Sequence, residues 1–372
     1  MIPSIKLNIQ IRKCLIEEHS MKQTAILKVN GEKPEKDKIR AAARIIRKGG
    51  LVAFPTETVY GLGADALNPE AVRRIYAAKN RPPDNPIIVH ISNKKDVYRL
   101  SNEVPRNADK LMNLWPGPLT LILKASSIVP KETTGGLDTV AIRMPNHKVA
   151  LALIQESAVP IAAPSANLAG RPSPTTAEHV RQDLEGRIDM ILDAGPTEIG
   201  VESTVVDLTS KPPQVLRPGG LPFEELRRIL KDVKLHPSVI ADKKLRLDRA
   251  PSPGMKHRHY SPKAQLILVE GDVEALIDKI QELVDRYNEK GKRVGVLATD
   301  ETRRSYRADV IKSLGSRDSP TCLAKNLFKL LREFDEEKVD VIIAEGVPLK
   351  HLGLAIMNRL RKASGFNIVK AS

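Results

Sequence analysis

The chain has 372 residues, of which 41% are hydrophobic, and it carries a formal net charge of +15. No apolar stretch approaches the roughly twenty residues of a membrane span, charged residues interrupt the first twenty positions, and the two cysteines lie far apart. These features exclude a transmembrane protein, a signal peptide, a disulfide framework and a cysteine-rich zinc site, and they indicate a cytoplasmic protein of two domains.

The first part of the chain alternates helical and strand patterns. Residues 1–30 form a predicted N-terminal extension, either disordered or in part a misassigned start, because a second methionine follows at position 21. An amphipathic run that ends at Gly49-Gly50 predicts a helix with a glycine stop. A short buried strand is expected at residues 51–54, and a second helix at 69–79, with proline in its first turn.

Further apolar runs predict strands that alternate with helical patterns as far as residue 230. They lie at residues 86–91, 119–123, 140–144, 159–163, 190–192 and 204–208. This alternation indicates a mixed α/β sheet, so residues 31–230 form the first predicted domain.

Composition changes at residues 231–263, where nine Lys and Arg face three Asp and prolines interrupt any periodic pattern. This segment is predicted to be an interdomain linker. Residues 264–372 then show a β-α-β-α-β order, typical of a smaller, parallel Rossmann-like domain. No Gly-x-Gly-x-x-Gly follows its first strand, which argues against a bound dinucleotide there.

The segment from Phe54 to Gly63 places hydroxyls and glycines between apolar strands, and Lys79 and Arg81 end the second predicted helix. An anionic substrate needs fixed positive charge, which a planar guanidinium and a compact ammonium supply in two forms. The glycines would let backbone amides approach the anion closely. The pattern predicts a phosphate site; the alternative is a solvated helix C-terminus, where basic residues are common.

Four separated motifs occur in order: the segment from Phe54 to Gly63, Lys79-Asn80-Arg81-Pro82, Pro164-Ser165-Ala166-Asn167, and Gly200-Val201-Glu202-Ser203-Thr204. Together they resemble the threonylcarbamoyl-AMP synthases that carry a YrdC-like domain. The resemblance runs from about Asp37 to the C-terminus. It implies a YrdC-like twisted mixed α/β sheet domain, an extended linker and a smaller Rossmann-like parallel α/β domain.

The resemblance implies which residues bind ATP. Lys79 and Arg81 would act on the phosphates as the catalytic residues. From the residues alone, Ser165 and Ser173 could equally belong to a capping turn before a helix near Thr175. Capping this helix is compatible with donating hydrogen bonds to phosphates. The further implied ATP-binding residues are Asn85, Thr139, Ser165, Asn167, Ser173, Arg217 and Tyr260.

The resemblance also implies a pocket for L-threonine, built from Thr58, His90, Arg143, Ala163 and Ser203. Arg143 ends an apolar strand, and a guanidinium is costly to bury unless it meets an anion. By resemblance that anion is the threonine carboxylate, whereas an internal Asp or Glu is the alternative partner. For Thr58 the alternative is a turn in which the hydroxyl bonds to local backbone.

The implied activity combines L-threonine, bicarbonate or CO2, and ATP into threonylcarbamoyl-AMP and pyrophosphate, for the threonylcarbamoyladenosine modification of tRNA. ATP is a substrate and Mg²⁺ is expected with it, while no tightly bound organic cofactor and no protein metal site are expected. The product would pass to a tRNA threonylcarbamoyltransferase complex. The linker with Tyr260 is a candidate lid, and a basic segment lying in solvent is its alternative.

Two other functions stay open on the sequence alone. The net charge and residues 231–263 would suit double-stranded RNA, and weak RNA binding is also compatible with the synthase. A network of solvated surface charges explains the same excess of Lys and Arg over Asp and Glu more simply. A carbamoyltransferase is the second alternative, but such proteins carry cysteine-rich zinc modules beside a YrdC-like domain, and the presence of only two cysteines argues against it.

Overall fold

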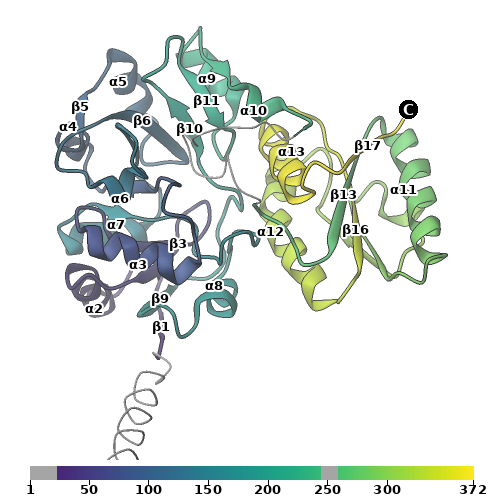
Figure 1. The fold of residues 1–372 in the computed structure, drawn as a ribbon, viewed down its shortest axis with the longest axis horizontal. Helices are drawn as coiled ribbons and strands as arrows, with labels where there is room; N and C mark the ends of the chain where they lie inside the picture. Colours follow the sequence, from purple (N-terminus) through teal and green to yellow (C-terminus); the bar gives the residue numbers. More distant parts are fainter. Residues whose placement is uncertain (1–22, 244–258) are drawn as a thin grey trace, which may run out of the picture.

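The computed structural model describes residues 23–243 and 259–372, which form two α/β domains side by side (Figure 1). The N-terminal domain contains β1 to α10, and the C-terminal domain contains β13 to β17. A large mixed sheet precedes a smaller parallel sheet, which confirms the predicted fold class.

A 12-stranded mixed sheet forms the N-terminal domain, in the order β1-β9-β2-β3-β8-β4-β7-β6-β10-β11-β12, with β5 paired to β6. Parallel neighbours such as β4 and β7 occur beside antiparallel ones such as β6 and β7. The strands are β1 (Ala25–Lys28), β2 (Val52–Phe54), β3 (Gly61–Asp65), β4 (Ile88–His90), β5 (Ser101–Glu103), β6 (Leu119–Ala125), β7 (Thr139–Arg143), β8 (Ile161–Ala162), β9 (Met190–Asp193), β10 (Thr204–Asp207), β11 (Gln214–Arg217) and β12 (Lys234–Leu235).

The helices of this domain follow their local sequence signals. α3 begins where the Asn68 side chain accepts hydrogen bonds from the next turn, and it ends at Asn80, whose φ is +50°. Lys79 is therefore the last helical residue, and Arg81 lies in the loop after it. The helices are α2 (Lys36–Arg47), α3 (Pro69–Lys79), α4 (Val97–Leu100), α5 (Arg106–Met112), α6 (Lys131–Thr134), α7 (Lys148–Ser157), α8 (Ala177–Leu184), α9 (Phe223–Ile229) and α10 (Pro237–Ile240).

Gly61 and Gly63, the glycines from which a close approach of backbone amides to a phosphate is expected, lie in the strand β3 (Gly61–Asp65). β3 pairs with β2 on one side and with β8 on the other. A Cβ added at Gly63 would lie 2.8 Å from Ile161 Cγ2 and 2.8 Å from Phe54 Cε1. The expectation is thus wrong for Gly63, because packing and not ligand approach requires this glycine.

The structure moves two predicted boundaries. β1 lies inside the predicted extension of residues 1–30, and it pairs in parallel with β9 at the sheet edge. β12 and α10 lie inside the predicted linker, and β12 pairs with β11. The connection between the domains therefore begins after α10. The rest of the predicted extension and the middle of the predicted linker, residues 1–22 and 244–258, lie outside the described residues.

Five parallel strands form the sheet of the C-terminal domain, in the order β15-β14-β16-β13-β17. The pattern did not predict β15, α13 or β17. α13 is buried on nearly all sides, and its polar residues Asn358, Arg359 and Arg361 are buried as well. The elements are β13 (Gln265–Glu270), α11 (Val273–Asn288), β14 (Val294–Ala298), β15 (Val310–Ser313), α12 (Pro320–Glu336), β16 (Val341–Glu345), α13 (Leu352–Ala363) and β17 (Ile368–Lys370).

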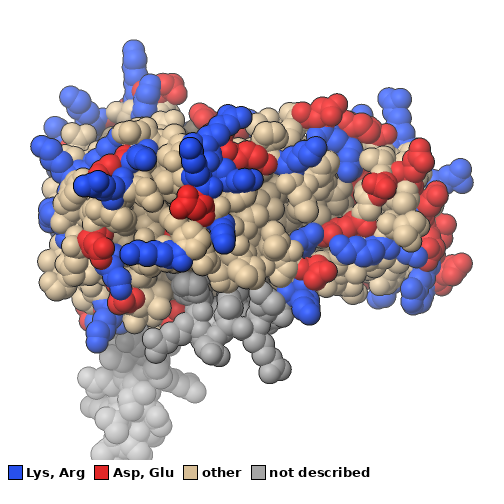
Figure 2. Space-filling view, turned by 90° about the horizontal axis from the view of Figure 1, so that it is seen from above, with Lys and Arg blue, Asp and Glu red and all other residues tan. Residues whose placement is uncertain are grey.

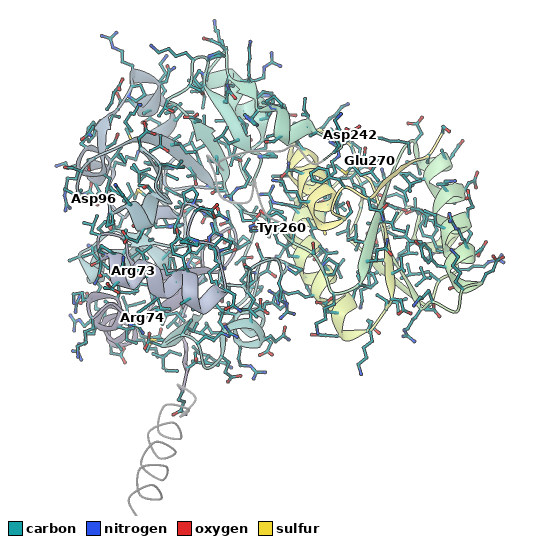
Figure 3. All side chains as sticks on the ribbon, viewed as in Figure 1. Arg73, Arg74, Asp96, Asp242, Tyr260 and Glu270 are labelled. Carbon is teal, nitrogen blue, oxygen red and sulfur yellow. The ribbon has the colours of Figure 1, made fainter. Side chains whose placement is uncertain are left out.

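Helices α12 and α13 pack directly against the N-terminal domain. Val59 and Val201 of that domain share one apolar core with Phe328 of α12. A Cβ added at Gly200 would lie 2.5 Å from the α12 backbone, so the two domains touch there without an intervening side chain. Tyr260 lies at this junction (Figure 3).

Side chains of both charge signs are interspersed over the face of the molecule shown in Figure 2. This arrangement is typical of solvated surface charge and not of a field of one sign. Among the helices in the described part of the chain, none has the length and apolarity needed to cross a bilayer.

Gly63→Ala should destabilise the protein by about 1–3 kcal/mol, because the added methyl group overpacks a site enclosed by two buried side chains. The measurement is the free energy of unfolding in urea. Gly31→Ala is the control: its added Cβ would make ordinary contacts of 3.8 Å and more, and we expect a change within about 0.5 kcal/mol. Equal losses in both variants would contradict this account of β3.

Candidate functional site

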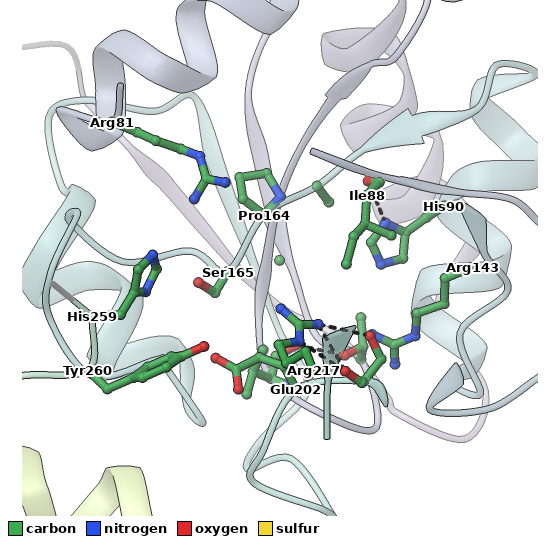
Figure 4. A pocket seen from close by; sticks show the side chains of 15 residues that line it. Arg81, Ile88, His90, Arg143, Pro164, Ser165, Glu202, Arg217, His259 and Tyr260 are labelled. Carbon is green, nitrogen blue, oxygen red and sulfur yellow. Dashed lines mark hydrogen bonds between the residues drawn. The ribbon is translucent and has the colours of Figure 1, made fainter. Parts of the chain in front are cut away.

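A cavity in the N-terminal domain lies where several strands end. β4, β7 and β11 each finish in a residue that lines it, namely His90, Arg143 and Arg217. β4 and β7 run parallel with His90 beside Arg143, so both side chains reach the same edge of the sheet. Figure 4 shows these two at one end of the cavity, and Arg81 and Tyr260 toward the other.

The structure brings most of the predicted site residues to this cavity. Eight of them line it: Arg81, His90, Arg143, Ala163, Ser165, Ser203, Arg217 and Tyr260. Six predicted residues do not line it: Thr58, Lys79, Asn85, Thr139, Asn167 and Ser173.

Arg143 forms a buried ion pair with Glu57 at the His90 end. Arg143 Nη2 lies 2.6 Å from Glu57 Oε2, and Nε lies 3.4 Å from the carbonyl oxygen of Gly117. An internal carboxylate, one of the two predicted partners, therefore engages this guanidinium. No described residue bonds to Nη1, so the guanidinium retains a donor for an anion in the cavity.

His90 is neutral at physiological pH. Its Nδ1 lies 3.2 Å from the carbonyl oxygen of Ile88, and its ring meets Phe54 edge-on. Burial, together with the nearby charge of Arg143, lowers the pKa of His90 to about 3. A neutral imidazole can hydrogen-bond to a ligand here without adding a second positive charge beside Arg143.

Two arginines bring positive charge to the middle and the far end of the cavity. Arg217 donates from Nε and Nη2 to the carbonyl oxygen of Ser203, at 3.1 and 3.0 Å. Arg81 donates from Nη2 to the carbonyl oxygens of Asn85 and Pro86, at 3.3 and 3.1 Å, and its buried Nε has no partner among the described residues. Burial lowers the pKa of Arg81 to about 10, which still leaves it charged at neutral pH.

Lys79 supports the wall of the cavity. Its Nζ donates to the carbonyl oxygens of Ser165 and Asn167. Ser165 Oγ donates to Asn167 Oδ1 at 2.6 Å, and Asn167 Nδ2 donates to the carbonyl oxygen of Arg171 at 3.1 Å. Burial and the charge of Arg81 hold the pKa of Lys79 well below its usual range. The motif around Ser165 is thus a hydrogen-bonded turn that Lys79 fixes in place.

Glu202 is a buried carboxylate on the wall beside Tyr260. Its Oε1 accepts a hydrogen bond from Ser173 Oγ at 2.6 Å, and its Oε2 accepts one from Arg359 Nε at 2.8 Å. Burial opposes its ionisation, but the charges of Arg359 and Arg217 outweigh burial and lower the pKa of Glu202 to about 2. The Tyr260 hydroxyl is directed toward this carboxylate (Figure 4).

Both halves of the chain match known family models. Residues 44–219 match the Sua5, YciO and YrdC model, described as "Telomere recombination", and residues 221–365 match the model of the threonylcarbamoyl-AMP synthase C-terminal domain. The threonylcarbamoyl-AMP synthase of Pyrococcus abyssi is 54% identical over 348 residues, which cover 93% of this chain and 99% of that one. The chain belongs to the threonylcarbamoyl-AMP synthase family.

Other members of this family also match this chain over most of its length. The threonylcarbamoyl-AMP synthase of Bacillus subtilis is 50% identical over 335 residues, which cover 89% of this chain and 94% of that one. The crystal structure of P. abyssi Sua5 complexed with L-threonine has a TM-score of 0.89 at 53% identity, and covers 94% of this chain and 100% of that one. The likeness thus extends over both domains.

Sequence reasoning missed four residues at this synthase-family site: Thr56, Glu57, Glu202 and His259. Thr56, Glu202 and His259 line the cavity, and Glu57 pairs with Arg143. Both carboxylates lie inside motifs that had been recognised. An acidic residue flanked by apolar strands was the signal that could have identified them, because a buried charge requires a partner.

The low pKa of His90 predicts a loss of stability in acid. An unfolded histidine titrates near pH 6.5 and the folded one near pH 3, so stability falls as the pH drops from 6.5 toward 3. At pH 5 this group should cost about 2 kcal/mol relative to pH 8.

His90→Asn should remove that part of the loss, measured as the difference in the free energy of unfolding between pH 8 and pH 5. The same pH dependence in the parent and in the variant would contradict a buried, neutral His90.

Proposed function

We propose that this chain synthesises threonylcarbamoyl-AMP and releases pyrophosphate, with L-threonine, bicarbonate or CO2, and ATP as substrates. The observation that carries this proposal is a single cavity with two chemically different ends. Arg143, neutral His90 and the Ser203 hydroxyl suit a small amino acid. Arg81 and Arg217 suit phosphates, since guanidinium groups bind them with charge-assisted hydrogen bonds.

L-Threonine would bind with its carboxylate on Arg143. Glu57 holds one side of this guanidinium, so the fork is oriented before the ligand arrives. The Thr58 hydroxyl lies 2.8 Å from Thr56 Oγ1, and Thr56 lines the cavity. We therefore assign the direct hydroxyl contact to Thr56 with Thr58 behind it, while the backbone at Ala163 would complete the pocket.

The reaction would proceed in two bond-forming steps. The threonine amine adds to CO2 and loses a proton, which gives a carbamate. A carbamate oxygen then attacks the α-phosphorus of ATP, the bond from this phosphorus to the bridging oxygen breaks, and pyrophosphate leaves. Arg81 would stabilise the negative charge that moves onto the leaving group, while Lys79 would act from behind the wall by holding the turn around Ser165.

The remaining ATP assignments fall into two groups, and Thr139 belongs to neither. Ser165, Arg217 and Tyr260 face the cavity, so they would contact the nucleotide directly. Three of the others would act from behind the wall: Asn167 through Ser165, Ser173 through Glu202, and Asn85 through its carbonyl oxygen, which accepts a hydrogen bond from Arg81. Thr139 lies at the opposite end of β7 from Arg143, so no contact among the described residues links it to the nucleotide.

Mg²⁺ would enter with ATP, as a ligand of its phosphates. Within residues 23–243 and 259–372, no group of three or more His, Cys, Asp or Glu is arranged to hold a metal ion. The carboxylate on the wall, Glu202, already bonds to Ser173 and Arg359. Phosphate oxygens and water would therefore supply most ligands of the ion, as is usual for nucleotide-bound Mg²⁺.

The segment with His259 and Tyr260 would act as the lid. Tyr260 is 2% exposed, and its ring stacks on Phe328 at a centroid distance of 5.2 Å. Carbamates and mixed anhydrides decompose in water, so a buried aromatic at the nucleotide end would protect both intermediate and product. The product would then pass to a tRNA threonylcarbamoyltransferase complex in the cytoplasm.

The direct test is pyrophosphate release by the purified protein with ATP and bicarbonate, with and without L-threonine. Release that requires both threonine and bicarbonate is the expected result. Release without threonine, or none in its presence, would overturn the proposal.

Arg81→Ala should lower turnover by roughly 100-fold, because the charge that stabilises the leaving pyrophosphate is lost. Arg143→Ala should mainly raise the KM for threonine, because it removes the proposed carboxylate partner. Steady-state kinetics with each substrate varied separates the two effects. Lys124→Ala is the control, because Lys124 is half exposed and pairs with Asp138 at the surface. In this variant the turnover and the KM for threonine should both stay within about twofold of the parent. Activity of the Arg81 variant within twofold of the parent would contradict its role.

A further inference from the structure

Three successive residues of the N-terminal domain, Gly200 to Glu202, are held by the C-terminal domain. Gly200 touches the backbone of α12, and Val201 enters the apolar core around that helix. Glu202 bonds to Arg359 of α13. The C-terminal domain therefore shapes part of the cavity wall, because Glu202 lines the cavity. The proposed reaction assigns no residue of that domain a role.

Arg359 is fully buried, and its bonds are directed to the nucleotide end of the cavity. Its Nε lies 2.8 Å from Glu202 Oε2, and its Nη1 donates to the carbonyl oxygen of Pro218 at 2.9 Å. Its guanidinium carbon lies 5.4 Å from the centre of the Tyr260 ring. Glu202 and Tyr260 line the cavity, and Pro218 follows Arg217, which also lines it. Arg359 thus contacts the wall of the cavity from behind.

A second arginine of the C-terminal domain holds the same wall. Arg332 of α12 donates from Nη2 to the carbonyl oxygen of Pro172 at 2.6 Å, and it pairs through both Nη atoms with buried Asp183. Ser173, the next residue after Pro172, donates to Glu202. Ser173 is therefore fixed at its backbone by α12 and at its hydroxyl, through Glu202, by α13.

We infer that Arg359 is a positioning residue of the synthase site, which holds Glu202 in place from behind so that the wall formed by Glu202 and Tyr260 is aligned for the nucleotide. The inference rests on the proposed function and deepens it, because it makes the C-terminal domain a part of the active site. Arg359 touches no substrate in this role; it acts through the carboxylate that it orients.

The role requires an ionised Glu202. Burial favours the protonated carboxyl, and the charge of Arg359 is the first of those that offset burial. When that charge is removed, the pKa of Glu202 rises, and the ionised fraction falls as the medium becomes more acidic. The charged and titratable groups that face Glu202 are Arg217 of β11, Arg359 and Lys362 of α13, and His259 and Tyr260 of the interdomain segment.

The test uses Arg359→Lys and Arg359→Met in the full-length protein, assayed by threonine-dependent pyrophosphate release from pH 5 to pH 8. We expect the KM for ATP to rise roughly 10-fold or more, because the aligned groups shift away from the nucleotide. In Arg359→Met, kcat/KM for ATP should in addition fall more steeply toward pH 5 than in the parent. Partial recovery of the pH profile in Arg359→Lys would follow from the retained charge.

The double variant R359M/E202Q guards against a failure to fold, since Arg359→Met leaves a buried carboxylate without its partner. Because both charges are then removed, its KM for ATP should match that of Glu202→Gln alone. Extra loss in the double variant would show that Arg359 acts by some route other than Glu202.

Arg361→Met is the matched control. Arg361 lies two residues further along α13 and forms a buried ion pair with Glu270, at 2.7 and 3.0 Å. It also donates from Nη1 to the carbonyl oxygen of Ile240 in α10, at 2.9 Å, so it joins the two domains as Arg359 does, but none of its partners in the described part of the chain lines the cavity. This variant should lower the thermal midpoint but leave the KM for ATP within about twofold of the parent.

The inference is overturned if the Arg359 and Arg361 variants lose stability alike and both keep the parent's KM for ATP and pH profile. A parent protein without threonine-dependent release would instead overturn the proposed function. The affinity for a non-hydrolysable ATP analogue, measured by calorimetry, would then still decide on Arg359: a loss confined to the Arg359 variants supports it, and equal affinity in all variants contradicts it.

Discussion

Buried positive charge is the constraint on which the site depends. Lys79, Arg81, Arg143 and Arg217 are each 8% exposed or less. Removing such groups from water costs several kcal/mol apiece unless the protein or a ligand replaces the solvent. Backbone carbonyl oxygens solvate three of them, and Glu57 pairs with Arg143. A polyanion in the cavity would complete this compensation, and the donors are in place before it binds.

The same constraint explains the contact between the domains. Glu202 brings negative charge among these cations, but it is itself buried and needs a donor on its other oxygen. That donor comes from α13, and the corresponding donor for Asp183 comes from α12. The domain contact therefore combines an apolar core with two buried ion pairs, and such pairs fix a geometry more than they add stability.

Elements with a one-sided pattern were predictable from the sequence. α3 has the expected bounds, because proline and asparagine signals stand at its ends. His90 and Arg143 could be placed at strand ends, because apolar runs precede them. β3 could not be recognised, since two glycines in a short segment resemble a loop. The burial of α13 could not be predicted, since its polar residues Asn358, Arg359 and Arg361 are buried against partners 119, 157 and 121 positions away. The pairing of Glu202 with Arg359 joins residues 157 positions apart, and no local pattern encodes such a contact.

The position of α12 and α13 after the N-terminal domain in the chain has a consequence for biosynthesis. A nascent chain leaves the ribosome from its N-terminus, and domains generally fold in that order. While α12 and α13 are still inside the ribosome, Glu202 lacks Arg359, Asp183 has Arg171 but lacks Arg332, and Gly200 has no helix to touch. The nucleotide end of the cavity is therefore completed only after α12 and α13 have been synthesised and have packed against the N-terminal domain.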